Sequence, residues 1–214
     1  MLVIHGRLSS LNVQKVMWTI GELSLPHQHV AAGGSFGGLD TPAFLAMNPN
    51  GRVPVLTDGE LAVWESQVIV RYLAAQYGRG TLWHEDPAER SRSDRWMDWA
   101  QATWQPDFMA LFWGYWRTPE PQRHAARIEA ARRACAQHLA ILDAHLARRD
   151  FVVGDALTMG DIALGAGFYR YFEMGLPTPE VLHVRAWYAR LCERPAYREH
   201  VMVAFDDLFG RLAY

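Results

Sequence analysis

The sequence Asn48-Pro-Asn-Gly-Arg-Val-Pro-Val-Leu56 precedes and enters a strand-like segment, and the fold prediction depends on it. Pro54 stands at the head of the apparent strand 53–56, where it removes one backbone donor from a sheet ladder. A proline at such a place indicates a turn, which can include a cis peptide bond. The preceding residue, Val53, can then offer its N–H and C=O groups to an extended peptide ligand. An ordinary turn is the alternative explanation.

The segments that follow predict a hairpin and a helix. The strand-like segments 53–56 and 61–63 flank Asp58-Gly59, a dipeptide typical of two-residue hairpin turns. Helical spacing resumes at Ser66, and the apolar stripe expected to be buried is Val68, Ile69, Tyr72 and Leu73. An antiparallel strand pair followed by a helix is therefore expected.

The segments before this stretch predict a parallel strand pair. The apolar run 2–5 predicts a buried strand, residues 12–23 a helix with one apolar face, and residues 26–30 a second strand. The glycine-rich segment 33–38 predicts a loop. The order β-α-β, loop, β-β-α predicts one mixed sheet in an α+β domain over residues 1–79.

The rest of the chain carries helical signals only. Asp86-Pro87 has the pattern of a helix start, with proline just inside the first turn. Helices are expected over residues 86–117, 122–149, 159–175, 182–193 and 196–208. Thr158-Met-Gly-Asp161 has the pattern of a capping box, with Asp in place of the usual Glu. An all-α helical bundle domain is therefore expected over residues 87–214.

The composition excludes several classes of protein. The chain has 214 residues, of which 50% are hydrophobic and 21% charged, and its formal net charge is −2. These values exclude a disordered chain and argue against a basic nucleic-acid-binding protein. The longest apolar stretch, near residues 109–116, is far shorter than the ~20 residues of a membrane helix. With no visible secretion signal and only two cysteines, a cytoplasmic protein is expected.

The first candidate site is Ser9-Ser10-Leu11-Asn12, which follows the first strand and begins the first helix. The N-terminus of a helix presents unpaired N–H groups and partial positive charge, which stabilise an anion. A serine hydroxyl there can donate a hydrogen bond to a bound thiolate. Lowering the pKa of a thiol by about two units takes roughly 2.7 kcal/mol, which these groups can supply. Alternatively, one of these side chains only caps the helix.

The second candidate site is Trp64-Glu65-Ser66, between the predicted hairpin and the next helix. Glu65 can pair with an ammonium group, while Ser66 and the helix N-terminus can hold a carboxylate. Together these groups suit the head group of an α-amino acid. The alternative is that Ser66 is only the N-cap of the helix.

Taken together, these segments resemble the cytosolic glutathione S-transferases over essentially the whole chain, and most of all the bacterial members related to the theta and phi classes. The resemblance rests on residues 48–56, on Trp64-Glu-Ser-Gln-Val-Ile-Val-Arg-Tyr-Leu73 and on the capping box at 158–161. It implies a thioredoxin-like N-terminal domain followed by the helical bundle, with glutathione as co-substrate. It also implies a homodimer in which the helices of residues 86–149 face the partner's first domain.

The resemblance implies a serine-based site. Ser10 corresponds best to the catalytic serine of the Ser-type classes, and Asn12 completes the Ser-x-Asn spacing. Ser9 is a neighbouring rival for this role. No cysteine lies near Ser10, which argues against the members that reduce mixed disulfides through their own thiol.

The glutathione-binding residues implied by the resemblance are Arg52, Val53, Pro54, Glu65 and Ser66. The backbone of Val53 would pair with the cysteinyl part of glutathione, with Pro54 cis, and Glu65 and Ser66 would hold the γ-glutamyl end. Members of the family often hold the glycyl carboxylate with a basic residue from the preceding loop. Residues 31–50 contain no Lys, Arg or His, so either Arg52 substitutes or the affinity for glutathione is lower.

The first long helix of the second domain walls the electrophile site in this family, and here it is rich in aromatic residues. Phe108, Phe112, Trp113 and Trp116 occupy neighbouring positions on it. An apolar aromatic pocket of this kind suits a hydrophobic or planar electrophile. The alternative is that these rings pack in the core or at a dimer interface.

These features predict a glutathione transferase of detoxification type that stabilises the glutathione thiolate through Ser10 for attack on a hydrophobic electrophile. One alternative is a non-catalytic module that binds glutathione, a hydrophobic ligand or another protein. Another is a glutathione-dependent disulfide reductase or dehalogenase. No metal is expected, because His27 and His29 have no third ligand nearby in the sequence, and no nucleic acid or membrane partner is expected.

Overall fold

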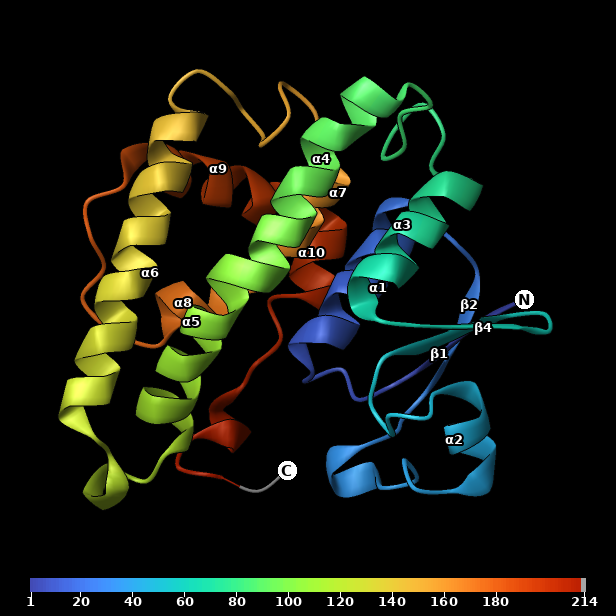
Figure 1. Ribbon diagram of the computed structural model, residues 1–214, viewed down its shortest axis with the longest axis horizontal. Helices are drawn as coiled ribbons and strands as arrows, with labels where there is room; N and C mark the ends of the chain where they lie inside the picture. Colours follow the sequence, from blue (N-terminus) through green and yellow to red (C-terminus); the bar gives the residue numbers. More distant parts are fainter. Residues whose placement is uncertain (213–214) are drawn as a thin grey trace. The chain divides into compact units, whose positions relative to one another are not determined.

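The computed structural model describes residues 1–212, which form two compact units (Figure 1). The first unit comprises residues 1–83 and 195–203, and the second comprises residues 84–194 and the segment that begins at Ala204. The sequence assigns residues 195–203 to the helical domain, whereas here they pack with the first unit. The last two residues of the predicted domain 87–214 lie outside the described residues.

The first unit is built on a four-stranded mixed sheet, as the sequence predicts. Its strands are β1 (Leu2–His5), β2 (His27–Val30), β3 (Val55–Asp58) and β4 (Leu61–Trp64). They lie in the order β2-β1-β3-β4, with β1 and β2 parallel and β3 antiparallel to both of its neighbours. The predicted hairpin is confirmed, but its turn consists of Gly59 and Glu60, because Asp58 still pairs with Leu61; Gly59 has a φ of 61°.

Helices cover both faces of this sheet. The helices α1 (Leu11–Glu22) and α3 (Ser66–Tyr77) lie on one face and α2 (Pro42–Met47) lies on the other (Figure 1). The core under α1 and α3 consists of Leu2, Ile4, Val13, Val16, Met17, Ile20, Leu56, Ile69 and Leu73. Under α2, Phe44 packs with Ala32 and Val55. Periodicity does not predict α2, because six residues make fewer than two helical turns.

The helix α10 (Pro195–His200) joins the first unit through close packing on α1. A Cβ atom on Gly21 of α1 would lie only 2.8 Å from Cβ of Ala196. The ring of Tyr197 also packs edge-on against Trp18, with 4.7 Å between the ring centroids. Contacts between residues so far apart in the sequence have no local signal, so the sequence does not predict that α10 packs on α1.

The described part of the second unit is helical apart from its connecting segments and one isolated bridge. A continuous helical rod runs from residue 87 to residue 117 and consists of α4 (Pro87–Trp99), η2 (Ala100–Trp104), α5 (Gln105–Leu111) and η3 (Phe112–Arg117). Pro106 has no N–H to donate to the preceding turn, and the π-helical segment η2 accommodates it. The helix α6 (Ala125–Leu146) packs beside α5 (Figure 1).

Up to residue 212, the second unit has five further elements: η4 (Glu120–Gln122), α7 (Met159–Gly165), α8 (Phe168–Glu173), α9 (Leu182–Glu193) and η5 (Asp206–Leu208). The predicted helix over 159–175 is wrong as one piece, because it breaks at Gly167. A Cβ atom there would lie 3.3 Å from the ring of Phe108. The predicted helix over 196–208 is also wrong, since α10 ends at His200 and only the short turn η5 (Asp206–Leu208) follows.

The capping box at α7 is confirmed and is tied to α9 as well. Asp161 is fully buried, and its carboxylate accepts hydrogen bonds from the N–H groups of Val152 (2.9 Å) and Thr158 (2.8 Å). The hydroxyl of Thr158 (2.8 Å) and Nε1 of Trp187 (2.9 Å) donate to it as well. Burial raises the pKa of this carboxyl, and these hydrogen bonds oppose the rise. One side chain therefore connects the 151–158 segment, α7 and α9.

Replacing Asp161 with Ala should lower the free energy of unfolding by about 3 kcal/mol or more, because several buried donors lose their acceptor. Chemical denaturation of wild type and variant measures this difference. Asp155→Ala is the matched control: Asp155 is exposed, and its removal should change stability by about 0.5 kcal/mol or less. Equal effects of the two substitutions would contradict the structural role of Asp161.

No helix within residues 1–212 is both long enough and apolar enough to cross a membrane.

Candidate functional site

The register of the sheet brings three loops to one end of the first unit. His5 at the end of β1 lies opposite Val55 at the start of β3, and Val55 lies opposite Trp64 at the end of β4. The segments that follow β1, precede β3 and follow β4 therefore emerge side by side. These segments carry Ser9, Ser10, Arg52, Val53, Pro54, Glu65 and Ser66. The sheet thus gathers the residues that the sequence predicts for one site.

Ser10 is the N-cap of α1. Its backbone is extended, with φ −82° and ψ 124°, and its hydroxyl makes no capping hydrogen bond. The backbone alone fixes its place: its N–H donates to the carbonyl of Arg7 (3.0 Å), and its carbonyl accepts from the N–H of Gln14 (2.9 Å). The hydroxyl of Ser10 is thus half-buried at a helix N-terminus without being used as a cap.

Val53 and Pro54 lie just before β3 and are joined by a cis peptide bond. The predicted strand 53–56 begins two residues later than expected, at Val55, because Pro54 has no N–H for the ladder. Val53 therefore stands outside the sheet pairing. It packs against the end of β1, where a Cβ atom on Gly6 would lie 3.2 Å from Cβ of Val53 and 2.5 Å from Cγ2 of Val13.

Asn48 holds the backbone that leads to Val53. Its side chain is buried, and Nδ2 donates to the carbonyl of Arg52 at 2.8 Å. Its Oδ1 accepts from both the backbone and the side-chain nitrogen of Asn50, each at 3.0 Å. Arg52 itself is exposed. The sequence motif includes Asn48 without indicating this role, which only the buried contacts show.

Glu65, and not Ser66, is the N-cap of α3. Its φ of 69° is unusual for a residue with a side chain and costs of order 1–3 kcal/mol. Ser66 is the first residue of the helix and is buried, whereas Glu65 is exposed. The first N–H groups of α3 have no acceptor within the helix, so this end of α3 suits a carboxylate.

Lys15 is the single lysine of the chain, and it is 1% exposed in the middle of α1. Its Nζ donates to Oδ1 of Asn12 at 3.3 Å. Burial lowers the pKa of Lys15 to about 7, and the negative charge of Glu65 opposes this shift. The sequence motifs do not include Lys15, although a lone lysine three residues after Asn12 in an apolar helix is a signal.

A guanidinium group also reaches the loop that contains no basic residue. A Cβ atom on Gly33 would lie 3.4 Å from Nη1 of Arg7, which follows β1. The loop of residues 31–50 therefore has a cationic neighbour that is distant in the sequence.

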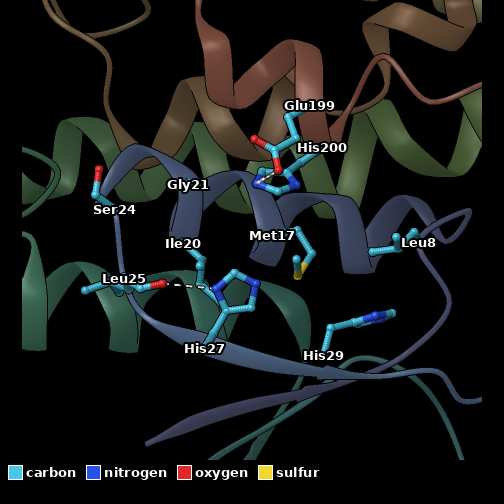
Figure 2. A pocket seen from close by; sticks show the side chains of 10 residues that line it. All are labelled: Leu8, Met17, Ile20, Gly21, Ser24, Leu25, His27, His29, Glu199 and His200. Atoms are coloured by element: carbon cyan, nitrogen blue, oxygen red, sulfur yellow. Dashed lines mark hydrogen bonds and ion pairs between the residues drawn. The ribbon is translucent and has the colours of Figure 1, made fainter.

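The first unit also has a cavity of about 400 Å³ between α1, β2 and α10 (Figure 2). None of the predicted site residues lines it, but three histidines do. His27 donates through Nδ1 to the carbonyl of Leu25 (3.0 Å), and His29 donates through Nε2 to that of Gly6 (2.6 Å). His200 faces them from α10 (Figure 2). Within residues 1–212, no group of three or more His, Cys, Asp or Glu side chains is arranged to hold a metal ion.

The four predicted electrophile-pocket residues lie in the second unit. Phe108 and Phe112 are fully buried, and Phe108 stacks on Trp104 with 5.7 Å between the ring centroids. Trp113 and Trp116 are half-buried. The ring of Trp113 lies under the guanidinium of Arg117, at 3.9 Å. These positions make Trp113 and Trp116 the accessible members of the group.

The ring of Trp116 is held by the C-terminal segment of the second unit. It contacts Phe205 and Phe209 with centroid distances of 4.9 and 5.0 Å. Its Nε1 also donates to the carbonyl of Phe205 at 3.3 Å.

Comparisons with known proteins agree with this architecture. Residues 4–82 match the glutathione S-transferase N-terminal domain, and residues 99–195 match the C-terminal domain. Glutathione S-transferase GstB of Escherichia coli K12 is 44% identical over 205 residues, covering 95% of this chain and 99% of that protein. Glutathione S-transferase 3 of Zea mays is 30% identical over 207 residues, covering 94% and 93%.

A solved structure is similar along nearly its whole length. The theta class glutathione S-transferase of Xanthomonas axonopodis pv. citri with glutathione bound is 50% identical, with a TM-score of 0.91. The match covers 95% of this chain and 98% of that one. The two matched domains, the relatives and the shared fold show that this chain belongs to the glutathione S-transferase family of enzymes.

Proposed function

We propose that this protein is a glutathione transferase in which Ser10 stabilises the thiolate of bound glutathione for attack on a hydrophobic electrophile. The observation that carries the proposal is the meeting of three different groups at one end of the sheet. The first is the hydroxyl of Ser10, which lies at the N-terminus of α1 and makes no capping hydrogen bond. The second is the backbone of Val53, which takes no part in the sheet pairing, and the third is the carboxylate of Glu65 at the N-terminus of α3. Glutathione offers a thiol, a peptide backbone and an α-amino acid head group to match them.

Each part of glutathione has a chemically suitable partner. The N–H and C=O groups of Val53 pair with the cysteinyl residue in the manner of an added strand. Glu65 binds the γ-glutamyl ammonium, while Ser66 and the first N–H groups of α3 bind the γ-glutamyl α-carboxylate. Arg52 holds the glycyl carboxylate, with Arg7 as a second guanidinium close to the neighbouring loop.

The reaction is a nucleophilic attack by sulfur. The Ser10 hydroxyl, the Asn12 amide and the N-terminus of α1 stabilise the thiolate, which lowers the pKa of the bound thiol. The thiolate then forms a C–S bond with an electrophilic carbon. In a substitution, the leaving group departs with the electron pair of the bond that breaks. In an addition, the electron pair of the π bond that breaks stays on the electrophile. Stabilisation of the anion and proximity of the two substrates supply the catalysis.

The electrophile side belongs to the aromatic residues of the second unit. Trp113 and Trp116 offer half-buried rings, with Phe108 and Phe112 packed in the core beneath them. Flat, weakly polar rings suit a hydrophobic or planar acceptor. A role in detoxification and a cytoplasmic location are part of this proposal.

The functional unit is a homodimer in this proposal. The edge strand β4 and the neighbouring helix α3 expose the apolar residues Leu61 (46%), Trp64 (39%) and Val68 (48%). Val68 is thus not part of the buried stripe that its spacing predicts. Exposed apolar residues on an edge strand are a liability for an isolated protein and favour a partner surface. The helices of residues 86–149 of the second copy are the proposed partner surface.

Ser10→Ala should raise the pKa of glutathione bound to the protein by about one to two units and lower kcat/KM about 100-fold, because one donor to the thiolate is lost. Thiolate absorbance as a function of pH and steady-state rates with a reactive aryl halide measure the two effects. Ser9→Ala is the matched control and should retain both values. If Ser9→Ala loses activity while Ser10→Ala keeps it, Ser9 is the catalytic serine and the assignment to Ser10 is wrong.

Glu65→Gln should weaken glutathione binding about 10- to 100-fold, because the ammonium group loses a charged acceptor. Titration calorimetry measures this change, and Cys-Gly, which lacks the γ-glutamyl group, should bind wild type and variant equally. Glu60→Gln, at the exposed hairpin turn, is the control and should bind glutathione like the wild type. A wild-type protein that is not retained on immobilised glutathione would instead favour a non-catalytic interaction module.

Leu61→Glu and Val68→Glu together should convert the dimer to monomers, because they place charges on the proposed apolar contact. Light scattering after size-exclusion chromatography measures the mass. Leu182→Glu, at a 67% exposed apolar residue on α9, is the control and should leave the dimer intact. A wild-type protein that runs as a monomer at all concentrations contradicts the proposed assembly.

A further inference from the structure

We propose that Lys15 is a positioning residue of the thiol site, which fixes the side-chain amide of Asn12 with its oxygen turned inward and its N–H group turned towards the sulfur. The inference rests on the proposed function, because it concerns how the glutathione thiolate is stabilised. It assigns Lys15 no contact with glutathione itself.

The hydrogen-bonding chemistry of the two side chains supports this assignment. Asn12 lies in the first turn of α1 and Lys15 three residues later, so the two side chains share one face of the helix. Nζ of Lys15 lies 3.3 Å from Oδ1 of Asn12. An ammonium group has donors only, so it binds the oxygen and not the nitrogen of an amide. Nδ2 of Asn12 is therefore on the branch of the amide that points away from Lys15.

The orientation of this amide has a direct effect on a bound anion. An N–H group donates a hydrogen bond to a thiolate and stabilises it, whereas a carbonyl oxygen repels it. The hydrogen bond from Lys15 holds the amide oxygen, so that Asn12 offers an N–H group to the sulfur beside the hydroxyl of Ser10.

The burial of Lys15 favours a specific role for its ammonium group over simple filling of the core. Burying an ammonium group in a helix that packs on a sheet is costly, and an apolar side chain of similar length would avoid that cost. A compact ammonium on a flexible stem can donate to one buried oxygen as a point charge, whereas a guanidinium is larger and planar.

The carboxylate of Glu65 also acts on Lys15. Burial lowers the pKa of Lys15, and the negative charge of Glu65 opposes this shift, so Glu65 favours the ammonium form that donates to Asn12.

A double-mutant cycle tests the proposal on the full chain. The variants are Lys15→Met, Asn12→Ala and the double variant, and the measured quantity is the pKa of bound glutathione from thiolate absorbance. Lys15→Met is nearly isosteric and removes a buried charge, so it is expected to fold. Lys15→Met and Asn12→Ala should each raise the thiol pKa by about one unit, and the double variant should raise it no further than Asn12→Ala alone.

Two further variants separate a positioning role from general damage to the helix. Thr19 lies one turn further along α1, and its buried hydroxyl donates to the backbone carbonyl of Lys15 at 2.8 Å. Thr19→Val removes this hydroxyl and should leave the thiol pKa unchanged. Asn12→Asp keeps an acceptor for Lys15 but loses the amide donor. It should raise the thiol pKa at least as much as Asn12→Ala, and this test does not require any Lys15 variant to fold.

Three results would overturn the proposal. They are an unchanged thiol pKa in folded Lys15→Met, additive effects of Lys15→Met and Asn12→Ala, and an unchanged thiol pKa in Asn12→Asp. If any of these occurs while Ser10→Ala still raises the thiol pKa, the proposed function stands without this role for Lys15. A wild-type protein that binds no glutathione would overturn both.

Discussion

The register between β1, β3 and β4 is the constraint on which the site depends. Ser10 and Glu65 are 55 residues apart, and they approach each other only because His5, Val55 and Trp64 lie in one row of the sheet. A shift of one residue would move a loop by about 3.3 Å and turn its neighbouring side chains to the other face. The relative positions of these loops therefore depend on the apolar core that fixes the strand register.

The costly features of the first unit concentrate at the same end of the sheet. Glu65 has a positive φ, and Lys15 is a buried ammonium. Val53 takes no part in the sheet pairing, and the buried side chain of Asn48 holds the backbone just before it. Strain and buried polar groups persist only where the surrounding structure holds them in place. Their common location supports the proposal that this end of the sheet binds glutathione.

Local signals predict most of the first unit, and long-range contacts account for what they miss. A short apolar run predicts the strand 2–5, turn residues predict the hairpin at Asp58-Gly59, and the capping box at Asp161 is visible from four residues. The short helix α2, the break at Gly167 and the packing of α10 on α1 depend on contacts with distant residues. The site residues remain predictions from local motifs, whereas the contacts of Lys15, Asn48 and Arg7 follow from burial and proximity, which the sequence does not show.

The proposed function places different demands on the two units. It assigns glutathione to backbone groups and short polar side chains at one end of the sheet and at two helix N-termini. Of the four aromatic residues that it assigns to the electrophile, Phe108 and Phe112 are fully buried, which leaves Trp113 and Trp116. Phe205 and Phe209 contact the ring of Trp116 and cover part of it. If the proposed function holds, selectivity for the electrophile should respond more to changes at residues 205–209 than to changes in the buried core of the helical rod.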